Sequence, residues 1–147
     1  MAVSGHKMIG SPLPCGVALT KAEYVARIAR SIEYVGVLDT TLTGSRNALT
    51  PLMMWYALRE RGFEGYREAV AGCLEVAEYA VARFTDSGIP TWRNKNSVTV
   101  VFSKPSARVV RKWQLAPYED IAHLIAMPHV TRETVDAVVD DCLKDPE

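Results

Sequence analysis

The chain has 147 residues, of which 48% are hydrophobic and 23% charged, a composition typical of one ordinary globular domain. Seventeen basic residues balance seventeen acidic ones and are scattered along the chain, so the basic patch that binds nucleic acid or anionic membranes is absent. No apolar run reaches the roughly 18 residues of a membrane span, and the first ten residues lack the apolar core of a signal peptide. We therefore predict a cytoplasmic protein without a nucleic-acid or membrane partner.

The first third of the chain mixes short strands with one helix. Residues 2–20 hold short apolar stretches separated by glycines and prolines, which is typical of a strand, a tight turn and a second strand, with a buried strand at 17–19. Apolar residues at intervals of three and four predict a helix over 21–34 that ends at Gly36. The segment 38–47 is rich in small and hydroxyl residues and predicts an ordered loop.

Two helices are predicted in the middle of the chain. Thr50 and Pro51 form a helix start, with a capping hydroxyl followed by proline at the first helical position, and this helix ends near Gly62. A longer helix is predicted over 65–84 from its single apolar stripe. In the first of the two helices, the side chains predicted to be buried are Leu52, Trp55, Tyr56 and Leu58.

The last third alternates strands with helices. We predict a strand over 97–102, a helix over 107–113, a strand over 121–126 and a closing helix over 131–143. Thr131 is the expected N-cap of the closing helix. This alternation is typical of an α+β arrangement.

No metal or disulfide site is indicated. The three cysteines, Cys15, Cys73 and Cys142, are widely spaced and form no CxxC pair, so we predict reduced thiols. His123 and His129 are six residues apart, and no cysteine or carboxylate accompanies them at metal-ligand spacing. We predict that the protein holds no metal.

Lys7 is the candidate nucleophile. It follows Ser4, Gly5 and His6 at a predicted strand end, ahead of a turn that we expect to leave its amine facing a cavity. An amine in low-dielectric surroundings loses its proton more readily and can attack an aldehyde. Spacing alone favours an ordinary surface lysine, because exposed lysines near an N-terminus far outnumber catalytic ones. His6 can hydrogen-bond an anionic ligand or serve only a structural role.

Four segments resemble the group II pyridoxal-phosphate-dependent amino-acid decarboxylases, in particular their histidine decarboxylase branch. VSGHKMIGSPLPCGV resembles the segment that carries the cofactor lysine, and VGVLDTTLTGSRNALTPLMMWYALRERG resembles the segment that follows it. NKNSVTVVFSKPS and HLIAMPHVT are similar to the family's small C-terminal domain. The four segments occur in the family's order, and the resemblance covers essentially the whole chain.

The resemblance implies an α/β protein of the aspartate aminotransferase-like type, fold type I, of which this chain is a C-terminal part. Residues 1–62 then correspond to a remnant of the large cofactor-binding domain. Residues 63–147 correspond to the small α+β domain. The same resemblance implies pyridoxal 5'-phosphate as the cofactor.

The resemblance also implies roles for three neighbouring residues. Lys7 matches the lysine that binds pyridoxal phosphate covalently. His6 matches a histidine that lies against the cofactor phosphate, and Ser4 matches a serine close to the same phosphate. Lys7 is therefore the expected catalytic residue, and all three are expected to bind the cofactor.

Four further residues are implied to lie near the substrate or the dimer interface. Thr43, Ser45 and Arg46 match a family loop close to the cofactor, in which Ala48 stands where the family usually has glycine. Ser97 matches a serine near bound substrate in the histidine branch. From its residue type and position alone, Ser97 is equally well interpreted as a polar residue at the start of a buried strand.

The implied reaction is decarboxylation of an L-amino acid, with L-histidine giving histamine and carbon dioxide. Serine or an aromatic amino acid is the alternative substrate, because the motifs around Lys7 are common to the whole group. A third interpretation is a noncatalytic interaction module that pairs with a longer decarboxylase chain. A heterodimer without cofactor absorbance would favour this last one.

In the family, most of the cofactor site precedes the lysine, and the corresponding residues are not in this sequence. They include the aspartate that pairs with the pyridine nitrogen and the side chain that stacks on the ring. We therefore expect the isolated chain to be a poor enzyme. The expected partners are a second copy in a homodimer, or a chain that supplies the large domain.

Overall fold

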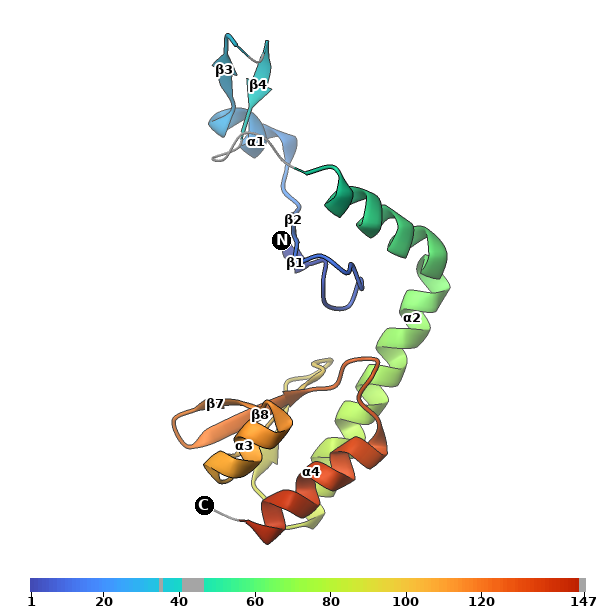
Figure 1. Cartoon of the computed structure of the whole chain (residues 1–147), viewed down its shortest axis with the longest axis vertical. Helices are drawn as coiled ribbons and strands as arrows, with labels where there is room; N and C mark the ends of the chain where they lie inside the picture. Colours follow the sequence, from blue (N-terminus) through green and yellow to red (C-terminus); the bar gives the residue numbers. More distant parts are fainter. Residues whose placement is uncertain (35, 41–46, 146–147) are drawn as a thin grey trace. The chain divides into compact units, whose positions relative to one another are not determined.

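The computed structural model describes residues 1–34, 36–40 and 47–145 and divides the chain into two compact units, Met1–Phe63 (unit 1) and Glu64–Glu147 (unit 2). Helix α2 (Leu49–Asp86) continues across the division and is interrupted at Gly62, where φ is 64° and ψ is 178° (Figure 1). Glycine adopts this left-handed φ without the steric cost that a Cβ would bring. Within the described ranges, no helix is both long and apolar enough to cross a membrane.

Unit 1 contains two small antiparallel hairpins (Figure 1). In the first, β1 (Ala2–Ser4) pairs with β2 (Gly16–Ala18). Helix α1 (Ala22–Ile28) follows, and the second hairpin then pairs β3 (Arg30–Ile32) with β4 (Val37–Asp39). The predicted strand, turn and strand at the start of the chain are thus confirmed.

The helix predicted over residues 21–34 is too long. Helix α1 ends at Ile28, and Ala29 already has extended backbone angles. Gly36, the predicted end of this helix, instead lies between β3 and β4 with φ of 70°. Apolar residues spaced three and four apart over so short a segment also fit a short helix followed by a strand. The positive φ of Gly36 permits a tight turn, and this turn allows β3 and β4 to pair.

The strand near Val17 is less buried than predicted. Val17 is half-buried, and Leu19, just beyond β2, is 52% exposed. At the start of α2, Asn47 rather than Thr50 provides the capping side chain, because Asn47 Oδ1 accepts the Thr50 N–H at 2.8 Å. An asparagine side chain serves this purpose as well as a hydroxyl does.

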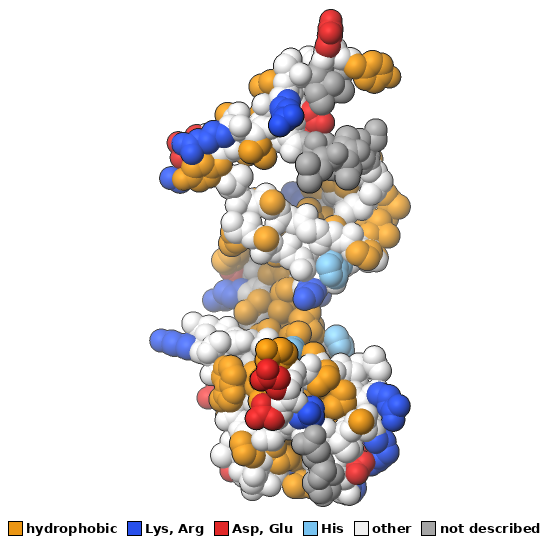
Figure 2. All heavy atoms as spheres, turned by 90° about the vertical axis from the view of Figure 1, so that its left-hand side faces the viewer, with side chains coloured by type: hydrophobic (Ala, Val, Ile, Leu, Met, Phe, Trp, Pro, Cys, Tyr) orange, Lys and Arg blue, Asp and Glu red, His pale blue; other side chains and the backbone are white. Residues whose placement is uncertain are grey.

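The prediction that the apolar side chains at the start of α2 are buried is wrong for this chain. The exposed fractions are 56% for Leu52, 57% for Trp55, 58% for Tyr56 and 44% for Leu58. Among the described side chains of unit 1, burial is reached only at Gly5 and Ser11. An apolar stripe shows that a helix has a face to cover, but the residues that cover it need not lie in the same segment. Figure 2 shows hydrophobic side chains, in orange, reaching the surface at several places.

Unit 2 is an α+β structure around an antiparallel sheet. The sheet has the order β5 (Thr91–Trp92), β6 (Thr99–Ser103), β8 (Ile121–Ile125) and β7 (Ala116–Tyr118). Helices α3 (Ala107–Trp113) and α4 (Arg132–Lys144) complete the unit together with the second part of α2. The predicted 107–113 helix, both predicted strands and the closing helix are confirmed, with shifts of one or two residues at some ends. The short strands β5 and β7 were not predicted.

The hydrophobic core of unit 2 lies between the sheet and its helices. Its fully buried large side chains come from α2, β6, α3 and α4, namely Phe84, Phe102, Val100, Val109, Val135 and Val139. Burying a side chain of this size stabilises a fold by roughly 1.5–3 kcal/mol. The confirmed elements of unit 2 are therefore those with an apolar face directed at this core.

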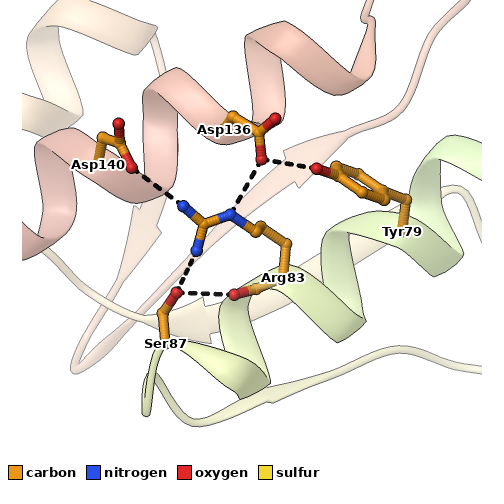
Figure 3. A network of polar contacts seen from close by, with 5 residues as sticks. All are labelled: Tyr79, Arg83, Ser87, Asp136 and Asp140. Atoms are coloured by element: carbon orange, nitrogen blue, oxygen red, sulfur yellow. Dashed lines mark hydrogen bonds and ion pairs between the residues drawn. The ribbon is translucent and has the colours of Figure 1, made fainter.

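A polar network joins α2 to α4 within unit 2 (Figure 3). Arg83 donates from Nε to Asp136 Oδ1 and from Nη2 to Asp140 Oδ1, each at 3.0 Å. The Tyr79 hydroxyl donates to the same Asp136 oxygen at 2.7 Å, and Ser87 accepts a hydrogen bond from Arg83 Nη1. The network fixes the register of the two helices beside the core.

Candidate functional site

The candidate nucleophile lies in the connection between β1 and β2. After Ser4 the chain turns through residues 5–9, and the Gly10 N–H donates to the Lys7 carbonyl at 3.0 Å. The Ser11 N–H donates to the Gly5 carbonyl at 2.9 Å, which closes the turn. The side chain of Lys7 is exposed. The prediction that its amine faces a cavity is therefore wrong for this chain, because the described residues of unit 1 place no wall around the turn.

His6 is held against the backbone on the far side of the same hairpin. Its Nδ1 lies 3.0 Å from the Cys15 carbonyl oxygen and 3.1 Å from the Cys15 amide nitrogen. The Cys15 carbonyl also accepts the Gly5 N–H at 2.9 Å. Ser4 is paired with Gly16 in the strand ladder. Ser4, His6 and Lys7 thus lie together at one end of a short hairpin, and Cys15 contacts this end through its backbone.

Gly5 allows the hairpin to approach α2. A Cβ at this position would collide with Cys15 Sγ and would lie 3.1 Å from Met54 Sδ. From the sequence, Gly5 was only part of a motif, and Cys15 and Met54 were not identified as its neighbours. A glycine directly before the candidate histidine was the one signal in the sequence, but its neighbours depend on how the hairpin folds back.

A hollow in unit 1 adjoins this contact. It is lined by residues of the hairpin and of the start of α2, namely Pro14, Cys15, Gly16, Asn47, Thr50, Pro51 and Met54. Ser11, the one buried polar side chain among the described residues, donates from Oγ to the Leu13 carbonyl at 3.2 Å and accepts the Leu13 N–H at 3.4 Å. Ser11 therefore shapes the turn, and sequence reasoning did not single it out.

The remaining predicted site residues lie either outside the described residues or in unit 2. Thr43, Ser45 and Arg46 lie outside the described residues. Ser97 belongs to unit 2, where its Oγ accepts the Thr99 N–H at 3.0 Å and its carbonyl accepts a hydrogen bond from Arg93 at 3.0 Å. The hydroxyl of Ser97 thus shapes the entry into β6, as expected for a polar residue at the start of a strand.

The chemistry of the hairpin end fits two parts of pyridoxal phosphate. A primary amine such as that of Lys7 forms a covalent bond with an aldehyde. The hydroxyl of Ser4 and a ring N–H of His6 can donate to phosphate oxygens, which accept only. The exposed amine shows that the described residues of this hairpin provide donors but no enclosure for the cofactor ring.

The sequence relatives of the chain include bacterial histidine decarboxylases. The chain is 48% identical over 146 residues to the histidine decarboxylase of Morganella morganii, a match that covers 99% of this chain and 39% of the relative. It is 47% identical over 148 residues to that of Pseudomonas fluorescens, covering 100% of this chain and 36% of the relative. The chain thus spans less than half the length of these relatives. No protein-family model matches it.

Solved structures share the fold over nearly all of the chain. An L-methionine decarboxylase from Streptomyces sp. 590, bound to 3-methylthiopropylamine, superposes with a TM-score of 0.85 at 34% identity. That superposition covers 99% of this chain and 32% of the enzyme. The glutamate decarboxylase of Lactobacillus brevis superposes with a TM-score of 0.74 at 18% identity over 97% of this chain, a likeness that concerns the fold alone.

These likenesses confirm the resemblance predicted from the four sequence segments and the fold that it implies. Identity to the histidine decarboxylases extends over nearly the whole chain rather than over the lysine motif alone. The fold is shared with decarboxylases at both high and low identity. The chain is therefore similar over nearly its whole length to bacterial histidine decarboxylases and has the fold of a C-terminal part of the pyridoxal-phosphate-dependent fold-type I enzymes.

Proposed function

We propose that the chain provides the lysine-bearing part of a pyridoxal-phosphate-dependent decarboxylase that converts L-histidine to histamine and carbon dioxide. The observation that carries this proposal is the 47–48% identity to histidine decarboxylases over nearly all of the chain. The identity to the L-methionine decarboxylase is lower, at 34%, which favours histidine over that substrate. The three free thiols support a cytoplasmic location, where cysteines stay reduced.

In this proposal Lys7 is the catalytic residue and binds the cofactor aldehyde through its amine. His6 and Ser4 hold the phosphate, since their donors lie at the same end of the hairpin as Lys7. Pyridoxal phosphate, when bound, supplies an electron sink that stabilises the negative charge left on the α-carbon as carbon dioxide departs. Once the substrate amine has displaced Lys7 from the cofactor aldehyde, the released Lys7 amine would return a proton to that carbon.

The loop residues and Ser97 have a supporting role in the proposal. We place Thr43, Ser45 and Arg46 near the cofactor and the dimer interface, and Ser97 near the substrate, on the strength of the family resemblance. The hydroxyl of Ser97 accepts the Thr99 N–H at 3.0 Å and donates to the Thr99 carbonyl at 3.5 Å. A further contact with substrate would therefore use its second lone pair, or would replace the long hydrogen bond to the Thr99 carbonyl.

Activity in this proposal requires the rest of the cofactor site, whose residues lie outside these 147. The chain spans 36–39% of the length of its relatives, and Lys7 is exposed. A second copy of the chain repeats the same residues, so the large domain must come from another polypeptide segment. The proposed assembly is a homodimer or a complex with a chain that supplies the large domain, and the uncovered stripe of Leu52, Trp55 and Tyr56 on α2 is an apolar surface suited to such a contact.

The first test uses the whole chain and its lysines. The chain is incubated with pyridoxal phosphate, reduced with borohydride so that any bond between aldehyde and amine becomes permanent, and mapped by mass spectrometry. Lys21 is a matched control because its side chain is also exposed, at 74%. Modification concentrated at Lys7, and lost in Lys7→Ala but retained in Lys21→Ala, supports the proposal. Equal modification of all exposed lysines contradicts a special role for Lys7 in this chain.

The second test supplies what the chain does not span. The chain is co-expressed with the remaining part of the Morganella morganii histidine decarboxylase, and the purified complex is given histidine, serine or an aromatic amino acid. Histamine formation that is abolished by Lys7→Ala and unchanged by Lys21→Ala establishes the reaction. Amine formed only from another amino acid identifies the alternative decarboxylase. A stable complex without cofactor absorbance and without product favours the noncatalytic interaction module, for which the uncovered stripe on α2 is the supporting observation.

A further inference from the structure

The contact between His6 and Cys15 determines which ring nitrogen of His6 carries the proton. His6 Nδ1 faces two backbone atoms of Cys15, the amide nitrogen at 3.1 Å and the carbonyl oxygen at 3.0 Å. An imidazole nitrogen accepts a hydrogen bond when it is unprotonated and donates one when it is protonated. Nδ1 can therefore bond to the Cys15 N–H or to the Cys15 carbonyl, and the choice fixes the tautomer.

The other hydrogen bonds of Cys15 favour the first arrangement. Its carbonyl already accepts the Gly5 N–H at 2.9 Å, so this oxygen has a partner whichever way the ring is protonated. Within the part of the chain that the structure describes, the Cys15 N–H donates only to His6 Nδ1. A proton on Nδ1 would point at this N–H and deprive it of its acceptor, whereas an unprotonated Nδ1 satisfies every group.

We propose that the backbone amide of Cys15 is a positioning group that selects, for the uncharged ring of His6, the tautomer with its proton on Nε2. The thiol has no part in this contact, so the residue type at position 15 matters only in that it must have an N–H. Resting on the proposed function, the consequence concerns the cofactor phosphate. Nε2 then presents a donor to phosphate oxygens, whereas the opposite tautomer would present a lone pair to them.

The tautomer is measured directly by nitrogen NMR of the uniformly labelled chain without cofactor. Long-range proton–nitrogen correlations distinguish a protonated from an unprotonated ring nitrogen, and His6→Gln identifies the signals among those of His123 and His129. We expect the pattern of a single tautomer with the proton on Nε2. We also expect a scalar coupling across the hydrogen bond from the Cys15 nitrogen to His6 Nδ1. A protonated Nδ1, or the absence of this coupling, overturns the proposal.

Two variants at position 15 separate the backbone from the side chain. Cys15→Ala keeps the N–H and is expected to leave both the tautomer and the coupling unchanged. Cys15→Pro removes the N–H and is expected to convert the His6 signals to those of a mixture of tautomers. An unchanged single tautomer in Cys15→Pro contradicts the proposal. If Cys15→Pro does not fold, the coupling in the unmodified chain still decides the question.

The two proposals fail in different ways. The tautomer of His6 is read without cofactor, whereas the role of Lys7 is read from covalent modification. A single tautomer together with unspecific lysine modification leaves the role of Cys15 intact and removes the role of Lys7. If modification is concentrated at Lys7 but His6 carries its proton on Nδ1, the role of Lys7 is supported and the role of the Cys15 amide is removed.

Discussion

The ring of Phe84 on α2 stacks on the ring of Phe102 on β6, with centroids 4.2 Å apart and planes 20° from parallel. Both side chains are fully buried, and they belong to the core that α2 shares with the sheet of unit 2. This contact therefore ties the second part of α2 to the sheet, far along the chain from the candidate nucleophile.

Replacing Phe84 by alanine is expected to destabilise unit 2 by about 3–5 kcal/mol, because the change removes buried apolar area and leaves a cavity. Phe63 is the control, since its ring is 81% exposed and its replacement by alanine should change stability by less than about 0.5 kcal/mol. Urea unfolding followed by far-ultraviolet circular dichroism gives both values. Equal transition midpoints for the two variants would show that the stacked pair does not anchor the core.

The network in Figure 3 predicts non-additive effects, because Tyr79 and Arg83 donate to the same oxygen of Asp136. Tyr79→Phe removes one hydrogen bond, and Asp136→Ala removes both. In the Asp136→Ala background, Tyr79→Phe should therefore cost nothing further. The side chains of Arg83 and Asp136 are 30% and 41% exposed, so their ion pair contributes less than about 1 kcal/mol and weakens in salt.

A double-mutant cycle by thermal unfolding, at low and high salt, measures this coupling. Additive losses would mean that Tyr79 and Arg83 act through separate partners. The phenol of Tyr79 offers a second readout, since its hydrogen bond to Asp136 is the main cause that raises its pKa. Ultraviolet titration of Asp136→Ala should therefore show a Tyr79 pKa closer to that of an ordinary tyrosine.

The stability of unit 2 is predicted to fall in acid because of two carboxylates on and just after α4. Hydrogen bonds from Lys112 and Trp113 lower the pKa of Asp141, and those from Arg108 and Ser106 lower the pKa of Asp145. A carboxylate with a lowered pKa in the folded state stabilises the fold above its unfolded pKa, near 4. That stabilisation is lost as the pH falls through the folded pKa.

We therefore expect the titration of Asp141 and Asp145 to change the free energy of unfolding little between pH 7 and 5. Below about pH 4, protonation of the two groups should decrease the free energy of unfolding. Asp141→Asn should be less stable than the unmodified chain at pH 7 and should lose less stability in acid. Asp86→Asn, at the exposed end of α2, is the control position. Urea unfolding at a series of pH values measures the slope, and identical slopes for Asp141→Asn and the unmodified chain would contradict the assignment.

The thiols of Cys15 and Cys142 are predicted to differ in reactivity. Burial, followed by the charge of Asp141, raises the pKa of Cys142 to about 11, so this thiol remains protonated at pH 8. Alkylation requires the thiolate and access to it, and Cys15 is only half-buried. Iodoacetamide at pH 8 should therefore label Cys15 first and Cys142 only after unfolding in urea. Peptide mapping of a time course checks this order, and labelling of both thiols at one rate would refute it.

The elements of unit 2 could be predicted from sequence because local and long-range signals agree there. The apolar stripe of α4 faces the core, and Thr131 accepts the Thr134 N–H as its N-cap. Helix α3 was predicted at its observed bounds, whereas its N-cap, Ser106, was not predicted. Strands β5 and β7 were missed because two or three residues are too few to show a period, and Pro117 within β7 argues against a strand.

Unit 1 and the candidate site were less accessible to physical reasoning from sequence. Its apolar stripes predicted burial that Leu52 and Trp55 do not reach, because a stripe does not reveal what covers it. Lys7 was identified through family resemblance, and the cavity expected around it is not found in the described structure. The contact of His6 with Cys15 depends on how the chain turns between β1 and β2, which residue types alone do not specify.

The approach of the first hairpin to α2 predicts that Gly5 tolerates no side chain. In Gly5→Ala, the new Cβ would collide with Cys15 Sγ and would lie 3.1 Å from Met54 Sδ, so the hairpin must shift, at a cost of about 1–3 kcal/mol. Gly72→Ala is the matched control, because a Cβ at that helical position meets no atom within 4 Å and should stabilise α2 by roughly 0.5–1 kcal/mol.

Hydrogen exchange at the Ser11 N–H reports on the hairpin, because this group donates to the Gly5 carbonyl at 2.9 Å. We expect faster exchange in Gly5→Ala and an unchanged rate in Gly72→Ala. Adding Cys15→Ala to Gly5→Ala removes the colliding Sγ while keeping the backbone N–H of residue 15. The double variant should therefore regain part of the protection of the Ser11 N–H. The protection that is still missing should come from the close contact with Met54. If the double variant exchanges as fast as Gly5→Ala, the close contact lies between Gly5 and α2 rather than across the hairpin.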